Sequence, residues 1–505
     1  MYDAGAWVLR ESAIADLPSD LRWLFESDAV TVEQLAALHA ALGVTTAADL
    51  AAAVESEAVR RVAGLNAAIE YQIGAALLDL RTAVPRIPLG RATAIVEPVL
   101  ARIQELAGTR WVTPAGSLRR GQETVGDIEI VAASDDPAAA IEELTRTPDV
   151  SRVLHRGARR LYLLIDRVQV GMRFPPPEHA GAQLLHLTGS YAHLNKLREL
   201  ARERGGRLTA DGYRPAGDAP LIAAHEDEIY AALGLPFVAP EIRHGDQEVD
   251  AARAGTLPAL ISQSDIRGDL HMHSTWSDGH DSIEQMARRC RDLGYEYCAI
   301  TDHSPHSAAS RNLSVDDVKR QADEVAGVRE RVPGLTILHG CEVDILPDGR
   351  LDLPDRVLER LDFVLASLHE GGGHGPDQLL RRYTSAMRHP LVNVITHPTN
   401  RILPYRSGYK LDYDQLFETA RETGTILEVD GAPAHLDMDG SLARRAMSAG
   451  ATIAIDSDAH RAEYLERQMR FGVMTARRAW IESRHVVNAR PLAAIRDLVA
   501  RKRAG

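Results

Sequence analysis

Nine histidine, aspartate and glutamate side chains in the second half of the sequence have the types and spacing of metal ligands. Each lies at or just beyond the end of an apolar run typical of a strand. They are His271, His273, Asp278, His303, Glu342, His369, His397, Asp458 and His460. Neutral imidazoles and carboxylates are the ligands that divalent cations take in proteins. Because one four-coordinate ion would use fewer of them, the set predicts two or three metals, an arrangement that suits phosphoester cleavage.

The spacing within the motifs explains how these side chains could meet. His271 and His273 lie two residues apart and project from one face of a strand, and Asp458 and His460 repeat this geometry. A carboxylate such as Glu342 can bridge two ions. A single histidine is more often a core or surface residue than a ligand, and we assign four others to that class: His306, His374, His389 and His435.

The segments around the nine residues predict the elements that must position them. Strand-like runs alternate with helical stretches, and the strands fall near 269–274, 297–302, 337–345, 362–368, 392–397, 425–430 and 452–457. Regular strand–helix alternation is typical of a parallel α/β barrel, whose active site forms at the C-terminal ends of its strands. We therefore predict an α/β multidomain protein in which residues 266–505 form a seven-stranded barrel.

A second candidate site lies in the first half, in the segment GSLRRGQETVGDIEI (116–130). Gly116 and Ser117 open a predicted helix whose amides can receive a triphosphate, and Arg120 supplies positive charge. Asp127 and Glu129 project to one face of a predicted strand and could hold Mg²⁺. A serine-capped helix beside an exposed strand would explain the same residues without a ligand.

The remaining segments indicate the domain organisation. Residues 1–85 are predicted to be helical, and residues 86–240 to form an α+β region with strands at 111–116, 126–134, 161–165 and 168–174. The loop-rich stretch 241–265 is predicted to be a linker to the barrel.

Composition limits the class of protein. With 505 residues, 45% of them hydrophobic and 26% charged, the chain is long enough for two or more domains that bury their own cores. A formal net charge of −13 argues against bulk electrostatic coating of nucleic acid, though not against a local basic groove. The three cysteines, the absence of a signal-like start and the absence of a long apolar run predict a reduced, cytoplasmic protein without a membrane span.

Six motifs of the second half, DLHMHSTWSDG, AITDHS, GCEVDIL, SLHE, THPTN and SDAH, resemble those of the PHP (polymerase and histidinol phosphatase) domain. The resemblance implies a distorted seven-stranded barrel with a trinuclear centre of Mn²⁺ or Zn²⁺. It implies one ion at His271, His273, Glu342 and Asp458, a second at Glu342, His369 and His397, and a third at Asp278, His303 and His460.

The first half resembles the nucleotidyltransferase region of family X DNA polymerases. The segment GS(116–117)…DIE(127–129), the LTGS at 187–190 with Gly189, and DEIYAALGLPFVAPEIR (227–243) carry this likeness. Together the two resemblances imply a bacterial family X polymerase with a C-terminal PHP domain. A nucleotidyltransferase-like palm and thumb would then precede the barrel, with a degenerate helix-hairpin-helix region at the N-terminus.

The polymerase-like site departs from the family pattern. Gly171 stands where the resemblance implies a third carboxylate, and Asp166 lies too far along the chain, at a predicted hairpin turn, to replace it. Glu129 replaces the usual second aspartate. In the predicted DNA-binding hairpin RVAGLN (61–66), Asn66 stands where a glycine would expose amides, although asparagine can adopt the left-handed conformation.

These observations favour a DNA-repair phosphodiesterase, a 3′-5′ exonuclease or 3′-end-processing enzyme, whose polymerase activity is weak or lost. The alternatives are a template-directed gap-filling polymerase and a small-molecule phosphatase of the histidinol-phosphatase type. The expected partner is DNA with a gap or a 3′ end, with no membrane and no obligate protein partner. Arg401 and Arg406, close after His397, are the candidates for holding a substrate phosphate.

Overall fold

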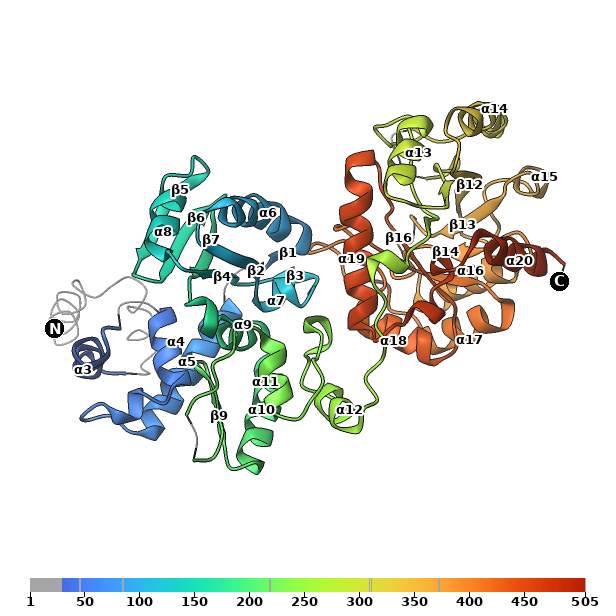
Figure 1. The fold of residues 1–505 in the computed structure, drawn as a ribbon. Coiled ribbons are helices and arrows are strands. Elements are labelled where there is room, and N and C mark those ends of the chain that lie inside the picture. Colours follow the sequence, from blue (N-terminus) through green and yellow to red (C-terminus); the bar gives the residue numbers. More distant parts are fainter. Residues whose placement is uncertain are drawn as a thin grey trace, which may run out of the picture.

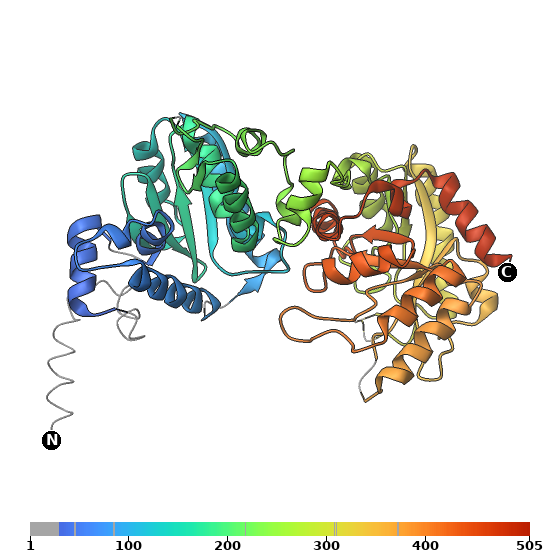
Figure 2. The same cartoon turned by 90° about the horizontal axis from the view of Figure 1, so that it is seen from below.

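The computed structural model describes residues 30–504, apart from 45, 46, 84, 85, 218, 308, 310, 371 and 372. The part of the predicted helical region that falls in residues 1–29 lies outside the described residues. Figure 1 shows an N-terminal body of helices and a mixed sheet beside a C-terminal barrel, and Figure 2 shows the same two bodies from below. Within the described part of the chain, no helix has both the length and the apolar character that a membrane crossing requires.

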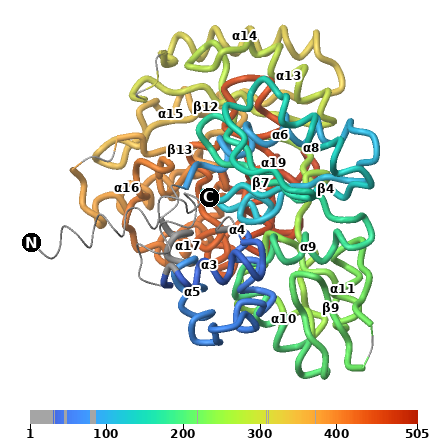
Figure 3. The backbone as a smooth tube through the Cα atoms, turned by 90° about the vertical axis from the view of Figure 1, so that its left-hand side faces the viewer, coloured from blue at the N-terminus to red at the C-terminus, as the bar shows by residue number. Residues whose placement is uncertain are grey.

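The first helices form a small bundle with its own apolar core. They are α3 (Val32–Leu42), α4 (Ala47–Glu55), the 3₁₀ turn η1 (Val59–Arg61) and α5 (Ala67–Ala83). Figure 3 shows α3, α4 and α5 close together. In the hairpin 61–66 the left-handed residue is Gly64 (φ +81°), whereas Asn66, which could adopt that conformation, does not. The Asn66 side chain instead accepts the amides of Ala68 and Ile69 at 3.0 Å and caps α5.

A five-stranded mixed sheet in the order β2-β4-β7-β6-β5 follows the bundle. Its region comprises β1 (Ile87–Pro88), α6 (Leu89–Glu105), β2 (Thr109–Pro114), α7 (Gly116–Arg119), β3 (Thr124–Val125), β4 (Ile128–Ser134), α8 (Pro137–Thr145), β5 (Val150–Arg156), β6 (Arg160–Ile165) and β7 (Val168–Arg173). Strands β4 and β7 run parallel, and the other neighbours run antiparallel. The edge strand β5 was not predicted, because its mostly exposed side chains give it no apolar pattern.

A third group of elements has a separate apolar core. It consists of η2 (Pro177–His179), α9 (Ala180–Thr188), α10 (Tyr191–Glu203), β8 (Arg207–Thr209), β9 (Gly212–Arg214), α11 (Glu226–Ala232), η3 (Pro240–Ile242) and α12 (Glu248–Ala254). Much of the stretch predicted as a linker is therefore ordered structure. Ile242, Val249 and Ala252 pack into this core, and the buried Arg243 guanidinium pairs with Glu226 at 2.6 Å.

Seven parallel strands in sequence order, β10 to β16, form the predicted barrel. The strands are β10 (Gly268–Asp269), β11 (Tyr297–Ile300), β12 (Thr336–Asp344), β13 (Phe363–Ser367), β14 (Val394–Ile395), β15 (Ile426–Asp430) and β16 (Ile453–Asp456). The surrounding elements are η4 (Gln263–Asp265), α13 (Ile283–Asp292), α14 (Val315–Arg331), α15 (Asp355–Leu358), α16 (Pro376–Arg388), α17 (Tyr413–Thr423), α18 (Gly440–Ser448), η5 (Ala462–Tyr464), α19 (Leu465–Arg478), η6 (Ser483–His485), η7 (Val487–Ala489) and α20 (Leu492–Arg503).

Alternate side chains of the strands fill two cores. In β11, Tyr297 and Ala299 face the barrel interior, whereas Cys298 and Ile300 pack toward the helices. The barrel is nearly closed, because Met272 pairs with Ala459 just beyond the ends of β10 and β16. The C-terminal ends of all seven strands consequently meet around one opening.

The barrel packs directly against the mixed sheet region. Leu436 and Phe471 of the barrel belong to the apolar core of that region. Glu123, in the loop after α7, pairs with Arg478 at 2.6 Å and lies 3.8 Å from Arg401. The loops that follow β14 and β15 are thereby held between the two halves of the chain.

Candidate metal centre

The structure brings all nine predicted side chains together at the C-terminal ends of the barrel strands. Glu342, the buried carboxylate of β12, lies at the centre of the group. One of its oxygens is 2.9 Å from His397 and 3.3 Å from His369, and the other is 2.9 Å from His303. A single carboxylate that faces three imidazoles from three strands has the geometry of a bridging ligand.

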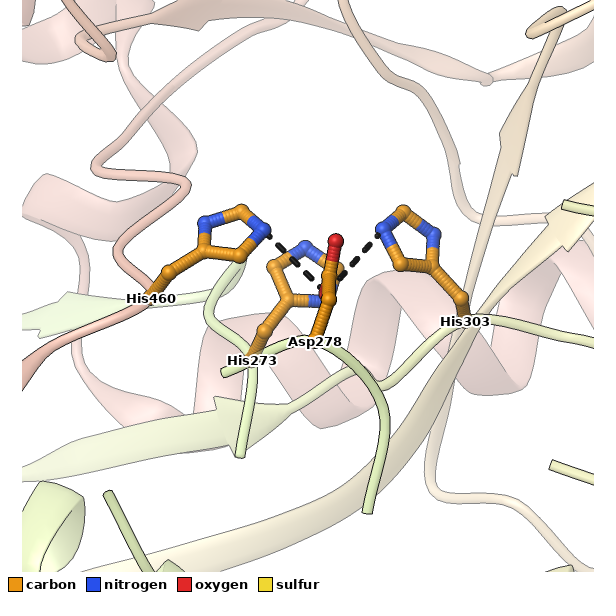
Figure 4. A group of neighbouring side chains, drawn as sticks. All are labelled: His273, Asp278, His303 and His460. Carbon is orange, nitrogen blue, oxygen red and sulfur yellow. Dashed lines mark ion pairs between the residues drawn. The ribbon is translucent and has the colours of Figure 1, made fainter. Parts of the chain in front are cut away.

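Two further carboxylates, Asp458 and Asp278, lie beside the remaining imidazoles of the group. Asp458 lies 3.0 Å from His273, whose Nε2 is 3.1 Å from that of His271. Asp278 lies 3.3 Å from His460 and 3.5 Å from His303. Figure 4 shows Asp278 between the rings of His303 and His460, with His273 beside it.

Among the nine predicted side chains, three groups of ligand atoms lie close enough to hold an ion each. Within each group the atoms are within 4.8 Å of one another, and the groups are His273, Asp278, His303 and His460; His271, His273 and Glu342; and His303, Glu342 and His369. Several ring nitrogens of the ligands, including Nδ1 of His273 and of His397, are buried and make no hydrogen bond among the described residues. Buried polar atoms of this kind are rarely left without a partner, so the donor set fits divalent cations.

Burial and mutual charge shift the ionisation of the ligands. Burial disfavours the charged form of Glu342, yet the surrounding imidazoles of His303, His369 and His271 hold its pKa well below the usual value. Burial also disfavours the His369 cation, but Glu342 and Asp344 outweigh it and raise the pKa of His369 to about 9. Burial and the neighbouring His303 and His460 lower the pKa of His273 to about 4. Protons therefore occupy part of the cluster that metal ions would take.

Carboxylates that the sequence did not single out hold the ligands in place. Glu428 in β15 lies 2.7 Å from Nδ1 of His271 and accepts the amide of His397 at 2.7 Å. Asp344 lies 3.2 Å from Nδ1 of His369. A carboxylate behind a ligating imidazole fixes its tautomer and orientation. These acids lie within apolar runs of the sequence. A charged residue inside such a run is the one sequence signal that could have indicated their role.

Asp302, next to His303, anchors the loop that carries Asp278. This buried carboxylate accepts hydrogen bonds from the backbone amide and the hydroxyl of Ser274, and from the same two groups of Ser277. It also accepts the side-chain amide of Gln321 at 2.7 Å. Five donors on one carboxylate leave the loop little freedom, which positions Asp278 against the imidazoles.

Comparison with known proteins agrees with this geometry. The family model of the PHP domain matches residues 269–431, and that of the DNA polymerase beta thumb matches residues 183–244. The chain is 36% identical over 494 residues, or 97% of its length, to the DNA polymerase/3′-5′ exonuclease PolX of Bacillus subtilis (strain 168), and the match covers 86% of that protein. The chain belongs to the PolX family. The resemblance to family X polymerases with a C-terminal PHP domain is thus confirmed.

Other relatives of this PolX-family chain match less than half of its length. A probable phosphatase of Syntrophotalea carbinolica is 32% identical over 207 residues, which is 39% of this chain and 80% of that protein. A second probable phosphatase, from Caldanaerobacter subterraneus, is 31% identical over 205 residues, 38% of this chain and 75% of that protein.

The polymerase-like site has a different character from the metal centre. Strands β4 and β7 pair so that Gly171 lies directly beside Glu129. A Cβ at Gly171 would lie 2.7 Å from the Tyr162 ring and 2.8 Å from both carboxylate oxygens of Glu129. The room for a third carboxylate is therefore already filled.

The charge of Glu129 is balanced by a neighbouring arginine of the same sheet. Glu129 lies 3.7 Å from the guanidinium of Arg173 and 3.5 Å from the hydroxyl of Tyr162, to which Arg173 also donates at 2.7 Å. Asp127, just before β4, is exposed. As predicted, Asp166 sits in the β6–β7 turn, where it pairs with Arg91 at 3.0 Å.

The other residues predicted to bind nucleotide lie in or near α7 and at the end of α9, and their role stays a prediction. Gly116 (φ +61°) begins the short helix α7, in which Ser117 follows it. Arg120 donates to the carbonyl of Thr188 at 2.6 Å, and burial with neighbouring arginines lowers its pKa to about 10. Gly189 allows close packing, because a Cβ there would lie 3.0 Å from Leu194.

Both arginines predicted to hold a substrate phosphate contact the loops near His397. Arg401 donates to the carbonyls of His435 and Leu436 and faces Glu123. Arg406 donates to the backbone and side-chain oxygens of Asn400 at 2.9 and 2.6 Å. Both guanidinium groups shape the loop after His397, and their role in holding a substrate phosphate stays a prediction.

Proposed function

We propose that the barrel is a metal-dependent phosphodiesterase that removes nucleotides from DNA in the 3′-5′ direction, as part of DNA repair. The observation that carries this proposal is the convergence of nine ligands from separate strand ends around the bridging carboxylate Glu342. The PolX relative, named a DNA polymerase/3′-5′ exonuclease and matched over nearly the whole chain, supports DNA as the substrate.

The residues present fit two or three ions, for which we propose Mn²⁺ or Zn²⁺. His271, His273, Glu342 and Asp458 would hold one ion, and Glu342, His369 and His397 a second. Asp278, His303 and His460 would hold the third. When bound, the ions supply an activated water and stabilise the leaving oxygen of the phosphodiester. Glu428 and Asp344 keep His271 and His369 oriented, and Asp302 keeps the Asp278 loop closed against the site.

A nuclease assay with one matched pair of variants tests this proposal. The substrate is a gapped duplex that carries a labelled 3′-terminal nucleotide, and the cofactor is Mn²⁺. We expect release of mononucleotide by the wild-type chain and by Asp292→Asn, an exposed acid on α13. We expect no release by Asp278→Asn, which keeps the side-chain volume and removes one ligand. Equal release by both variants would refute the proposed site.

We also propose that polymerase activity has been lost. With Gly171 in place of a carboxylate, and Glu129 paired with Arg173, the site no longer presents three acids to metal ions. The polymerase-like half then serves to bind DNA and to support the barrel loops.

The partial relatives favour a second candidate, hydrolysis of a small phosphomonoester, since two of them are named probable phosphatases. Comparing turnover of a small phosphomonoester with that of the gapped duplex distinguishes the two. We propose a cytoplasmic location, where DNA is available and where buried, unpaired Cys290, Cys298 and Cys341 stay reduced.

A further inference from the structure

The loop after β15 brings one more histidine to the edge of the metal centre. The ring of His435 stacks on that of the ligand His397, with centroids 5.4 Å apart and planes at 19°. From the sequence we assigned His435 to the structural class. In the structure, ligand atoms of His435, Asp430 and Asp458 lie within 4.8 Å of one another.

The hydrogen bonding of His435 leaves one nitrogen available as a ligand. Its Nδ1 lies 2.9 Å from the backbone carbonyl of Arg401. Because a carbonyl oxygen only accepts, Nδ1 carries the proton, and the neutral ring then has its lone pair on Nε2. Arg401 donates back to the backbone carbonyl of His435 at 2.8 Å, so the backbone of this residue is held as well as its ring. A backbone carbonyl behind Nδ1 is a common support for a metal-ligating histidine.

Asp430, the last residue of β15, presents a carboxylate oxygen that lacks a partner. Its Oδ1 accepts the amide of Ala432 at 2.6 Å, whereas Oδ2 is buried and accepts no hydrogen bond. Among the described residues, no arginine or lysine forms an ion pair with Asp430, although the side chain is fully buried. A buried carboxylate oxygen without a donor is unfavourable unless a proton or a cation satisfies it.

The backbone holds the shared carboxylate in a strained conformation. Asp458 has φ +48°, in the left-handed region that side chains with a Cβ seldom adopt. Its amide is fixed by the carbonyl of His271 at 3.0 Å. Strain of this kind is retained where the surrounding structure requires one side-chain direction. Here that direction places the carboxylate between His273 and the pair Asp430 and His435.

We propose that Asp430, His435 and Asp458 form a fourth cation site, which shares Asp458 with the site proposed at His271, His273 and Glu342. Two carboxylate oxygens and one imidazole nitrogen favour Mn²⁺ or Mg²⁺ over Zn²⁺, and leave positions open for water or a phosphate oxygen. The proposal rests on the proposed function only in that the barrel must bind metal.

Counting bound Mn²⁺ on the full-length chain tests the fourth site. Metal-free protein is dialysed against Mn²⁺ at saturating concentration, and bound ion is measured by elemental analysis. We expect His435→Gln and Asp430→Asn to hold one ion fewer per chain than the wild type. The control His389→Gln, which changes a histidine paired with Asp355 at the end of α16, should equal the wild type.

An equal number of ions in His435→Gln and the control would overturn the fourth site. Absence of bound Mn²⁺ from every form, the wild type included, would instead refute the metal centre of the proposed function. Since Asp430→Asn can disturb its neighbours, anomalous diffraction from wild-type crystals soaked in Mn²⁺ gives an independent answer. A peak between Asp430, His435 and Asp458 is expected, and a map with peaks only at the other three groups contradicts the proposal.

Discussion

The barrel and the mixed sheet each place a glutamate on a strand beside another parallel strand, and the two glutamates have opposite surroundings. Glu342 in the barrel faces the imidazoles of three strands, which can release their protons to solvent and bind a metal. Glu129 in the sheet faces the guanidinium of Arg173, which stays charged, and the hydroxyl of Tyr162, which donates a hydrogen bond to it. Glu342 can therefore bind a cation, whereas the charge of Glu129 is already balanced by Arg173.

If polymerase activity has been lost, as we propose, this difference explains how the fold of the sheet is kept without it. Once the position of Gly171 carries no carboxylate, the Tyr162 ring and the Glu129 carboxylate occupy the space, and Arg173 supplies the charge that an ion would bring. The sheet keeps its packing, because an internal ion pair and a ring replace the metal. In the barrel, the carboxylates face imidazoles that can lose their charge, and not an arginine that keeps it.

The largest effect is expected from removing the central charge of the barrel. Glu342→Gln should lower exonuclease activity on the order of 10³-fold, because loss of several kcal/mol of metal-dependent stabilisation costs tenfold per 1.4 kcal/mol. Glu129→Gln, the matched change in the sheet, should leave the rate of nucleotide release unchanged. Comparable losses in the two variants, measured on the same labelled duplex, would show that both sites take part in one reaction.

A smaller effect is expected from the carboxylate behind His271. Glu428→Gln keeps the size of the side chain but removes the charge that orients the imidazole, so we expect Mn²⁺ affinity to fall about 10- to 100-fold. The dissociation constant from a Mn²⁺ titration measures this. An unchanged constant would mean that the barrel backbone alone orients His271.

The free energy of unfolding should change with pH in opposite directions with and without bound metal. The pKa values of His369 and His460 are raised to about 9 and about 8 in the metal-free fold. Their contribution to the free energy of unfolding is complete below pH 6.5 and is lost as pH rises through 8 to 9. Metal binding requires the neutral rings, so Mn²⁺ should add most stability over that same range. Urea unfolding at pH 6.5 and 8.5, with EDTA or Mn²⁺, measures both slopes, and parallel slopes would contradict the assignment.

The smallest effect is expected from restoring the missing carboxylate of the sheet. Gly171→Asp places a Cβ against Tyr162 and Glu129, so the variant should unfold more easily by about 1–3 kcal/mol, the usual range for overpacking. It should incorporate no nucleotide. If it gained template-directed synthesis at wild-type stability, the sheet would be a polymerase site that lacks a single group.

How much the sequence could predict depended on the distance between the residues that act together. The nine ligands follow apolar runs, and parallel strands bring their ends to one opening, so the seven strands and the location of the ligands were predictable. Asp302, Asp344 and Glu428 act on residues far away in the chain, and buried strand runs give no sign of these contacts. His435 and Arg401 depend on the fold of two loops packed against the other half of the chain, which spacing cannot indicate.

The most direct test of the contrast between the two halves is one gapped duplex, labelled at the 5′ end of the strand that borders the gap. It is incubated with the full-length chain and Mn²⁺, with and without all four deoxynucleoside triphosphates. We predict that the labelled strand shortens under both conditions and is lengthened under neither. Extension of the strand when nucleotides are present, or an unchanged strand in both reactions, would contradict the account.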